Sequence, residues 1–374
     1  MKNILLISLV VVSASNQVNA QDVGIGTVTP NSQAILHIDV GANTTKGLLI
    51  TGTSFSGTVP DLGGGARLMF FPGRAALRAG YVGLTQWNNA NTGYASVAMG
   101  ESTTASGDHA MAMGLNCIAS GSYSLAVGNG STSSAIYSNA LGFGCTAGGS
   151  NSFAEGFVNN ANGVSSVALG SLATASGDQS VAIGHNISTN GKTGSFFFAD
   201  SDPFNRGVRV IGSPDQMACR FNGGYYFISN NSGADIGVQV VAGSNSWSVI
   251  SDSRRKEKFL PVDGEDCLVK ISKLQLTTWN YKGQDSKSFR HYGPMAQDFY
   301  ASFGKDELGT IGCDTLINQQ DFLGVNLIAI QALEKRTAAL MDENKKLETE
   351  IRKQKTVNEE LKARLDKIER RMRK

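Results

Sequence analysis

The segment Ser166-Val-Ala-Leu-Gly170-Ser-Leu-Ala-Thr-Ala-Ser-Gly177-Asp-Gln179 decides the fold, because close copies of it recur along the chain at a fixed spacing. Its first glycine belongs to a series of seven that lie 14 residues apart, and each is preceded two residues earlier by an alanine. These glycines are Gly100, Gly114, Gly128, Gly142, Gly156, Gly170 and Gly184. A second glycine series keeps the same period from Gly93 and is interrupted only at Ala135. A fixed period of this kind is typical of a solenoid, whose repeats bury their apolar faces only by stacking on each other.

Small and aliphatic residues alternate within each repeat, which is the period of a β-strand. The glycines recur at half-repeat spacing, where a corner needs positive φ or close backbone approach. We therefore expect each repeat to form one coil of two short strands and two tight turns, stacked into parallel sheets. The interior of so short a coil has room only for small side chains, so we expect the alanine column inside. The aliphatic column beside it, such as Val167 and Leu169, then faces outward and needs a partner.

Residues 94–195 resemble the heads of trimeric YadA-like adhesins, whose signature is a Ser-Val-Ala-Ile-Gly strand. The matching strands are Ser96-Val-Ala-Met-Gly100, Ser124-Leu-Ala-Val-Gly128, Ser166-Val-Ala-Leu-Gly170 and Ser180-Val-Ala-Ile-Gly184. The resemblance implies a mainly β fold, a left-handed parallel β-roll and a homotrimer, so the chain's first expected partner is itself.

The N-terminus reads as a signal peptide over residues 1–20, with a charged start, a short apolar run and a small-residue cleavage site at Ala20. We therefore expect an exported protein at the cell surface or outside the cell, without a membrane span in the mature chain. The net charge of +2 gives no indication of a nucleic-acid partner. The four histidines are scattered, so we expect no metal and no cofactor. Five cysteines cannot form a complete disulfide framework within one chain, and we expect all five to be packing residues.

The remaining segments are less regular. Residues 21–93 contain short strand-like runs, and within them Arg67 to Gly80 is expected to pair onto the first coil. Residues 196–250 are richer in aromatic residues and are expected to form a β-rich neck.

A heptad pattern begins at Ile330, and residues 332–374 are expected to form a coiled coil. Its a positions are Ile330, Thr337, Asn344, Ile351, Asn358, Leu365 and Met372, and its d positions are Leu333, Leu340, Leu347, Gln354, Leu361 and Ile368. Asparagine at a often accompanies dimers, whereas the head resemblance implies a trimer; we favour the trimer.

Three blocks before the heptads carry the chemistry. They are Ser251-Asp-Ser-Arg-Arg-Lys256, then His291-Tyr-Gly-Pro-Met-Ala-Gln297, then Asp321-Phe-Leu-Gly-Val-Asn-Leu-Ile-Ala-Ile-Gln331. In this order they resemble the small α+β intramolecular chaperone domain of endosialidases and phage tail spikes, the S74 peptidase family, over residues 251–331. The resemblance implies that the domain drives trimer assembly and then releases itself by cutting the bond between Ile250 and Ser251. Ser251 is then the nucleophile and Lys256 the general base, while Arg254 and Arg255 are candidate cations that favour a neutral lysine. His291 is a candidate supporting residue, and we favour a structural or orienting role for it over that of a second base.

The sequence therefore predicts an exported, trimeric, fibre-like surface protein whose chaperone domain cleaves itself. One alternative is a non-cleaving, chaperone-tipped fibre in which Ser251 caps a turn and Lys256 is solvated. Another is a tail-spike-like protein that binds or degrades a surface glycan. Glycosidic cleavage usually needs two facing carboxylates. Degradation is disfavoured because the four carboxylates of the repeats do not form such a pair; they are Glu101, Asp108, Glu155 and Asp178. The sequence does not identify the glycan or the host or matrix ligand that such a surface protein would bind.

Overall fold

The computed structural model describes residues 23–27, 31, 33–42, 47–201, 207–230 and 236–373. The predicted signal peptide lies outside these residues. The chain divides into two compact units, and the border lies between Asn222 and Gly223.

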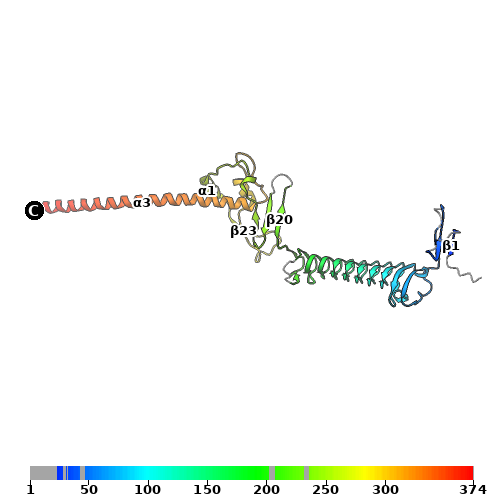
Figure 1. Ribbon diagram of the computed structural model, residues 1–374. Coiled ribbons are helices and arrows are strands. Elements are labelled where there is room, and N and C mark those ends of the chain that lie inside the picture. Colours follow the sequence, from blue (N-terminus) through cyan, green and yellow to red (C-terminus); the bar gives the residue numbers. More distant parts are fainter. Residues whose placement is uncertain are drawn as a thin grey trace, which may run out of the picture. The chain divides into compact units, whose positions relative to one another are not determined.

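The first unit is a β-solenoid (Figure 1). Its longer strands are β5 (Val97–Glu101), β7 (Met111–Leu115), β9 (Leu125–Asn129), β11 (Asn139–Phe143), β13 (Phe153–Phe157), β15 (Val167–Ala175), β16 (Val181–Ser188) and β17 (Phe196–Ala199). Its shorter strands are β6 (Thr104–Ala105), β8 (Ile118–Ala119), β10 (Thr132–Ser133), β12 (Thr146–Ala147), β14 (Asn160–Ala161), β18 (Arg209–Val210) and β19 (Met217–Arg220). Successive coils pair in parallel and in the register of the sequence repeat, so Ala140 lies opposite both Ala126 and Ala154. The predicted solenoid is confirmed.

The interior of the coils is filled by small side chains, as predicted. The alanines of the repeat, from Ala98 to Ala182, have an exposed fraction of 0%. The shorter strands contribute a second inward column that includes Ala105, Ala119, Ala147 and Ala161. Val167 and Leu169, on the opposite face of the same strand as Ala168, are only partly buried. The aliphatic column therefore faces out of the coil.

The corners differ in part from the prediction. The glycines of the first series have positive φ, but they lie within the longer strands rather than at the corners. The left-handed corner residues follow two positions later and include Ser102, Asn116, Val158 and Leu172. In the second glycine series, represented by Gly163, a Cβ atom would collide with the backbone of the next coil. Close approach between coils, more than the turn itself, therefore requires glycine.

An antiparallel hairpin closes the N-terminal end of the solenoid. It comprises β3 (Gly65–Phe71) and β4 (Ala76–Val82), with the short helix η1 (Pro72–Arg74) between them, and β4 pairs in parallel with β5. This confirms that Arg67 to Gly80 pairs onto the first coil. Before the hairpin, β1 (Val23–Ile25) pairs in parallel with β2 (Leu36–Ile38), and after it η2 spans Asn89–Asn91.

Arg78 occupies the position in β4 that alanine holds in the coils, and it is fully buried. Its guanidinium donates to the carbonyls of Leu77, Ser96 and Ala105 and to the Ser96 hydroxyl. Burial lowers the pKa of Arg78 to about 10. This side chain thus terminates the alanine column.

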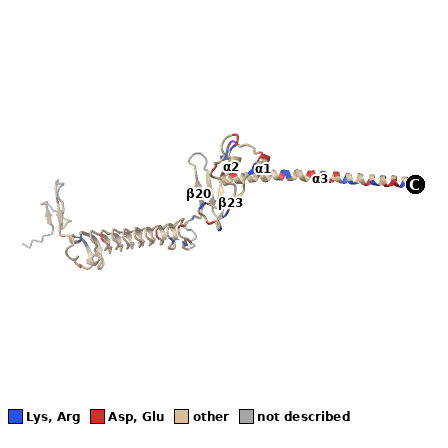
Figure 2. Ribbon diagram, turned by 180° about the vertical axis from the view of Figure 1, so that it is seen from behind, with Lys and Arg blue, Asp and Glu red and all other residues tan. Residues whose placement is uncertain are grey.

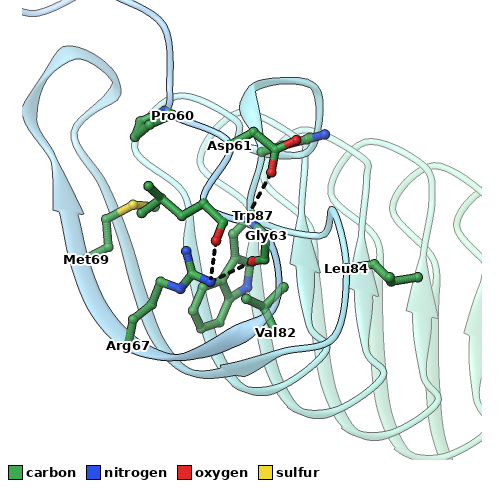
Figure 3. Close-up of a pocket in the computed structure, with 10 residues that line it drawn as sticks. Pro60, Asp61, Gly63, Arg67, Met69, Val82, Leu84 and Trp87 are labelled. Atoms are coloured by element: carbon green, nitrogen blue, oxygen red, sulfur yellow. Dashed lines mark hydrogen bonds between the residues drawn. The ribbon is translucent and has the colours of Figure 1, made fainter.

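The loop before β3 folds over the same end (Figure 3). Arg67 donates to the Gly63 carbonyl at 2.6 Å, and the Gly63 N–H donates to Asp61 at 3.1 Å. The enclosed cavity is about 10 Å³, which is space for roughly one water molecule. We therefore assign it to packing rather than to ligand binding.

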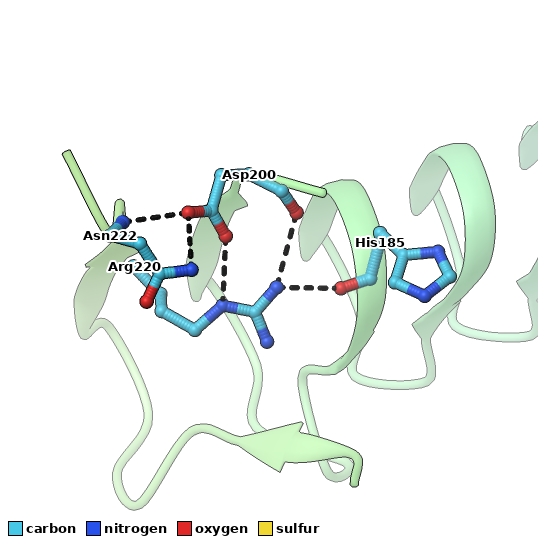
Figure 4. Close-up of polar contacts among 4 residues, drawn as sticks. All are labelled: His185, Asp200, Arg220 and Asn222. Atoms are coloured by element: carbon cyan, nitrogen blue, oxygen red, sulfur yellow. Dashed lines mark hydrogen bonds and ion pairs between the residues drawn. The ribbon is translucent and has the colours of Figure 1, made fainter. Parts of the chain in front are cut away.

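A polar network lies at the C-terminal end of the solenoid (Figure 4). The Arg220 Nε donates to Asp200 at 3.3 Å, and its Nη2 donates to the carbonyls of His185 and Asp200. Asn222 donates to the second Asp200 oxygen from its backbone and its side chain. The parallel sheet therefore continues to Arg220, into the segment that we assigned to the neck.

The second unit begins with an antiparallel sheet of β20 (Gly224–Ile228), β21 (Gly237–Val241) and β22 (Ser248–Val249). After it come η3 (Ser253–Arg255), α1 (Gly264–Lys273), the antiparallel pair β23 (Thr277–Trp279) and β24 (His291–Gly293), α2 (Ala296–Phe303) and α3 (Gln319–Met372). The small core of the helices is formed by Cys267, Phe299, Ala329 and Ala332.

Helix α3 begins earlier than the heptads, because Asn318 caps it by accepting from the Gln320 N–H. Its first turns pack against α1, whereas the heptad positions from Leu340 onward are exposed in the single chain. Figure 2 shows few charged residues on the solenoid and many along α3. Among the described residues, no helix has the length and apolarity that a membrane span requires.

The cysteines follow the prediction only in part. Cys117, Cys145 and Cys267 are buried, and burial raises the pKa of the Cys117 thiol. Cys219 and Cys313 are exposed, so the expectation that all five are packing residues is wrong for these two. Both lie outside the coil interior, where the repeat places no constraint on them.

Candidate functional site

The candidate site begins where the three-stranded sheet of the second unit ends. β22 pairs with β21, and the N–H of Ile250 donates to the Gly237 carbonyl at 3.4 Å. Ser251 is the first residue beyond this pairing. The backbone up to Ile250 is therefore held by the sheet, and the bond between Ile250 and Ser251 lies directly after it.

A capped turn follows Ser251 and reverses the direction of the chain. Asp252 is the N-cap of η3, and its carboxylate accepts from the Arg254 N–H at 3.0 Å. The N–H of Lys256 in turn donates to the Ser253 carbonyl at 3.2 Å. Because the turn closes between these residues, the side chain of Lys256 can reach back to Ser251.

Ser251 and Lys256 are in direct contact. The Lys256 Nζ donates to the Ser251 Oγ at 2.7 Å. This distance lies in the range expected for a nucleophile and its adjacent base. Both side chains are exposed in the single chain. Of the predicted site residues, the structure brings these two together.

Asp252 is a positioning residue that the sequence reasoning did not single out. Its carboxylate accepts from the Arg254 Nε and forms an ion pair with the Arg254 Nη2 at 2.7 Å. The hydrogen bonds from Arg254 lower the pKa of Asp252. The charge of Arg254, which we expected to act on Lys256, is therefore paired with Asp252. The signal in the sequence was an aspartate directly before a short turn, which is a common cap.

His291 lies in an aromatic cluster instead of at the dyad. β24 pairs with β23 so that His291 is opposite Trp279, and the two rings stack at 4.6 Å. Tyr281 contacts both rings edge-on. Within the described part of the chain, no hydrogen bond joins His291 to Ser251 or Lys256. The cluster supports a structural role for this histidine.

No cluster of histidine, cysteine, aspartate and glutamate that could hold a metal ion is found among the described residues. The hydroxyl of Ser251 and the amine of Lys256 are the pair of groups that acyl transfer by a serine nucleophile with an adjacent base requires.

Comparison with protein families supports both parts of the chain. Residues 251–306 match the family described as chaperone of endosialidase, Peptidase_S74. Residues 92–116, 119–144 and 161–186 match the YadA head domain repeat. No curated protein matches the chain. The chain thus joins repeats that are similar to the YadA head repeat to a following segment that is similar to the chaperone domain of endosialidases.

Proposed function

We propose that the protein is an exported, homotrimeric surface fibre whose chaperone domain assembles three chains and then releases itself. The release is a single cut between Ile250 and Ser251. The observation that carries this proposal is the contact of 2.7 Å between the Lys256 Nζ and the Ser251 Oγ. The family matches support the head and the chaperone domain, and the contact supports the cut.

In the proposed reaction the Ser251 Oγ attacks the carbonyl carbon of Ile250. Lys256 accepts the hydroxyl proton and passes it to the Ser251 nitrogen as the peptide bond breaks. The product is an ester between the Ile250 carbonyl and the Ser251 Oγ, and water then hydrolyses this ester. The serine hydroxyl is regenerated at a new N-terminus, so each chain reacts once and needs no external substrate.

Assembly supplies the condition that this reaction needs. Lysine acts as a base only after it has lost its proton, and burial favours the neutral form. Both members of the dyad are exposed in the single chain. We therefore propose that neighbouring chains cover the dyad in the trimer, so that cutting follows assembly.

The test is the mass of the purified chain and its variants. Wild type should give two fragments, divided between Ile250 and Ser251, with serine as the new N-terminus. Ser251→Ala removes the nucleophile and Lys256→Ala removes the base, so each should leave an uncut trimer. Lys256→Arg should also leave an uncut trimer, because a guanidinium stays protonated at usable pH. Ser253→Ala is the matched control and should be cut normally.

Two results would contradict the proposal. Normal cutting of Ser251→Ala would assign the reaction to another residue or to an outside protease. A wild-type trimer that stays intact for days would leave only the assembly function, which is the alternative of a non-cleaving fibre.

A further inference from the structure

A stack of aromatic rings runs along one corner of the solenoid and ends in an open ring. His109, Tyr123 and Tyr137 occupy equivalent corners of successive coils, and their neighbouring rings stack at 4.8 and 5.1 Å. Tyr94 continues the column from His109, and Phe55 stacks on Tyr94 at 4.4 Å with an angle of 13° between the rings. Tyr123 has a stacked ring on each side, whereas Tyr94 and His109 meet edge-on.

Phe55 differs from the rings behind it. It is 81% exposed, and Tyr94 is the ring that covers one of its faces. Its backbone is fixed in the left-handed region, with φ of 58°, and its N–H donates to the Gly73 carbonyl at 2.8 Å. A large apolar side chain that is exposed in the single chain on a backbone held in the left-handed region is a candidate for a binding role.

A cleft of about 310 Å³ lies beside this ring, lined by Phe55, Gly57, Gly73, Arg74, Tyr94 and Asp108. Its volume is at the lower end of the range for small-molecule sites, so the cleft suits a ligand of about one six-membered ring better than a long oligomer. All the lining residues lie in the first unit.

The two charged groups of the cleft are held in place by the scaffold. The Arg74 Nη1 donates to the Thr92 carbonyl at 2.6 Å, and its Nη2 donates to Asn89 at 3.1 Å. The Asp108 Oδ1 accepts from the Tyr94 N–H at 2.9 Å. The second Asp108 oxygen and the Arg74 Nε have no hydrogen-bond partner in the described part of the chain. Groups fixed before a ligand arrives lose little freedom when it binds.

We infer that this cleft binds a neutral pyranose sugar. A pyranose has a face of C–H groups that can pack on the electron-rich face of Phe55, and its hydroxyls both donate and accept hydrogen bonds. The carboxylate of Asp108 and the guanidinium of Arg74 match these two properties. Arg74 and Asp108 are the two charged residues of the lining and have opposite signs, so the cleft has no net charge that would favour an anionic or a cationic ligand.

This inference rests on the proposed adhesin role and gives its ligand class. The chain offers matched controls. Asp178 accepts from the Val164 N–H at 2.9 Å, which is the same structural contact as that of Asp108, but it does not line the cleft. Tyr137 ends the ring column at the other side and is 50% exposed, also away from the cleft.

The experiment measures binding of methyl pyranosides to the full chain by saturation-transfer NMR. The neutral probes are methyl β-D-glucopyranoside, galactopyranoside and mannopyranoside, and the acidic probe is methyl β-D-glucuronide. At least one neutral probe should bind. Phe55→Ala and Asp108→Asn should each weaken it by about tenfold, the loss expected for one good contact. Tyr137→Ala and Asp178→Asn, which change residues outside the cleft, should bind like wild type.

Three results would overturn the inference. The first is that no neutral probe binds. The second is that Phe55→Ala and Tyr137→Ala weaken the binding of a neutral probe equally. The third is that the glucuronide binds more tightly than the neutral probes and that Asp108→Asn strengthens its binding further. Light scattering and fragment mass are recorded on the same samples. A failure to trimerise or to cut would count against the proposed function. The sugar measurement could still be interpreted, because Ser251 and Lys256 are not among the lining residues of the cleft.

Discussion

At the scale of single residues, glycine in the solenoid is required by distance as much as by conformation. Gly142 has φ of 112°, and a Cβ atom there would meet the carbonyl of Gly156 in the next coil. We predict that Gly142→Val destabilises the rod by about 1–3 kcal/mol or more, because strain and collision act together. Thermal unfolding of the purified rod, followed by circular dichroism, measures the change.

The matched control is Gly130, which also has positive φ but has open space where its Cβ would lie. Other coils place Ser102 and Asn116 at the equivalent corner. Gly130→Asn should therefore cost only a few tenths of a kcal/mol, because asparagine tolerates the left-handed region. Equal losses for the two variants would show that conformation alone requires glycine.

At the candidate site, Asp252 is predicted to act through the turn. Asp252→Ala removes both the cap and the ion pair with Arg254, so Lys256 is held less well and self-cleavage should slow by about tenfold. Asp252→Asn retains a capping oxygen and should retain most of the rate. The measurement is the time course of fragment formation at neutral pH, and an unchanged rate in Asp252→Ala would exclude this positioning role.

The pH dependence separates Asp252 from Lys256. Because the pKa of Asp252 is lowered in the folded chain, the support that it gives the turn is present above its ordinary value of 3.8 and is lost as pH falls through the lowered pKa. Asp252 therefore stays charged from neutral to alkaline pH. The titration of Asp252 should therefore contribute nothing to the pH dependence of the cleavage rate in that range, and Asp252→Asn should leave the shape of the profile there unchanged.

At the scale of elements, α3 has two distinct parts. Its first turns pack on α1, where Ala332 lies against Gly264 and Arg336 forms an ion pair with Glu265. The part from Thr337 onward carries most of the exposed heptad positions, although Ile330 and Leu333 before it are exposed as well. A deletion of residues 332–374 would therefore damage the domain itself as well as the coiled coil.

Deleting residues 337–374 is the cleaner test of the coiled coil. This variant should keep the fold of the second unit but fail to form trimers, and it should therefore not cut itself. Light scattering reports the number of chains, and gel analysis reports the cut. Normal trimers and normal cutting in this variant would show that the coiled coil is dispensable for assembly.

The elements also show what the sequence could predict. The 14-residue period indicated the coils, their register and the inward alanines, because a solenoid repeats one local rule. The ends do not repeat. The buried Arg78 and the network of Arg220 with Asp200 depend on contacts between residues that are distant in sequence, so no period indicates them.

The candidate site could also be predicted from the sequence only where the contacts are local. Ser251 and Lys256 were predicted from a resemblance, and the turn that joins them spans six residues, so local chemistry brings them together. For His291 the sequence favoured a structural or orienting role, but it did not indicate the partner, because the stacking on Trp279 depends on the pairing of β23 with β24. A motif in a single sequence does not show which tertiary neighbour a distant side chain will have.

At the scale of the whole molecule, the coils are so alike that the rod could have a different number of coils. For the same reason, the coils alone do not fix the register between neighbouring chains. Each coil presents nearly the same alanine and glycine columns to its neighbour, so chains slipped by one coil would bury nearly the same surfaces. The two closed ends and the chaperone domain are the parts that distinguish one register from another. We infer that assembly from the C-terminal side aligns the chains before the coils stack.

This view predicts that a whole coil can be removed. Deleting residues 138–151 joins Tyr137 to Ser152 and places the strand Phe153–Phe157 where Asn139–Phe143 was. The shortened rod should fold, trimerise and cut like wild type, because the new interface between β9 and β13 again places alanine opposite alanine and glycine opposite glycine. Deleting residues 138–150 shifts the strand by one position, exchanges its inner and outer faces, and should give aggregated chains. Fragment mass, circular dichroism and light scattering distinguish these results, and equal failure of both deletions would mean that the rod is a unique structure rather than a stack of equivalent coils.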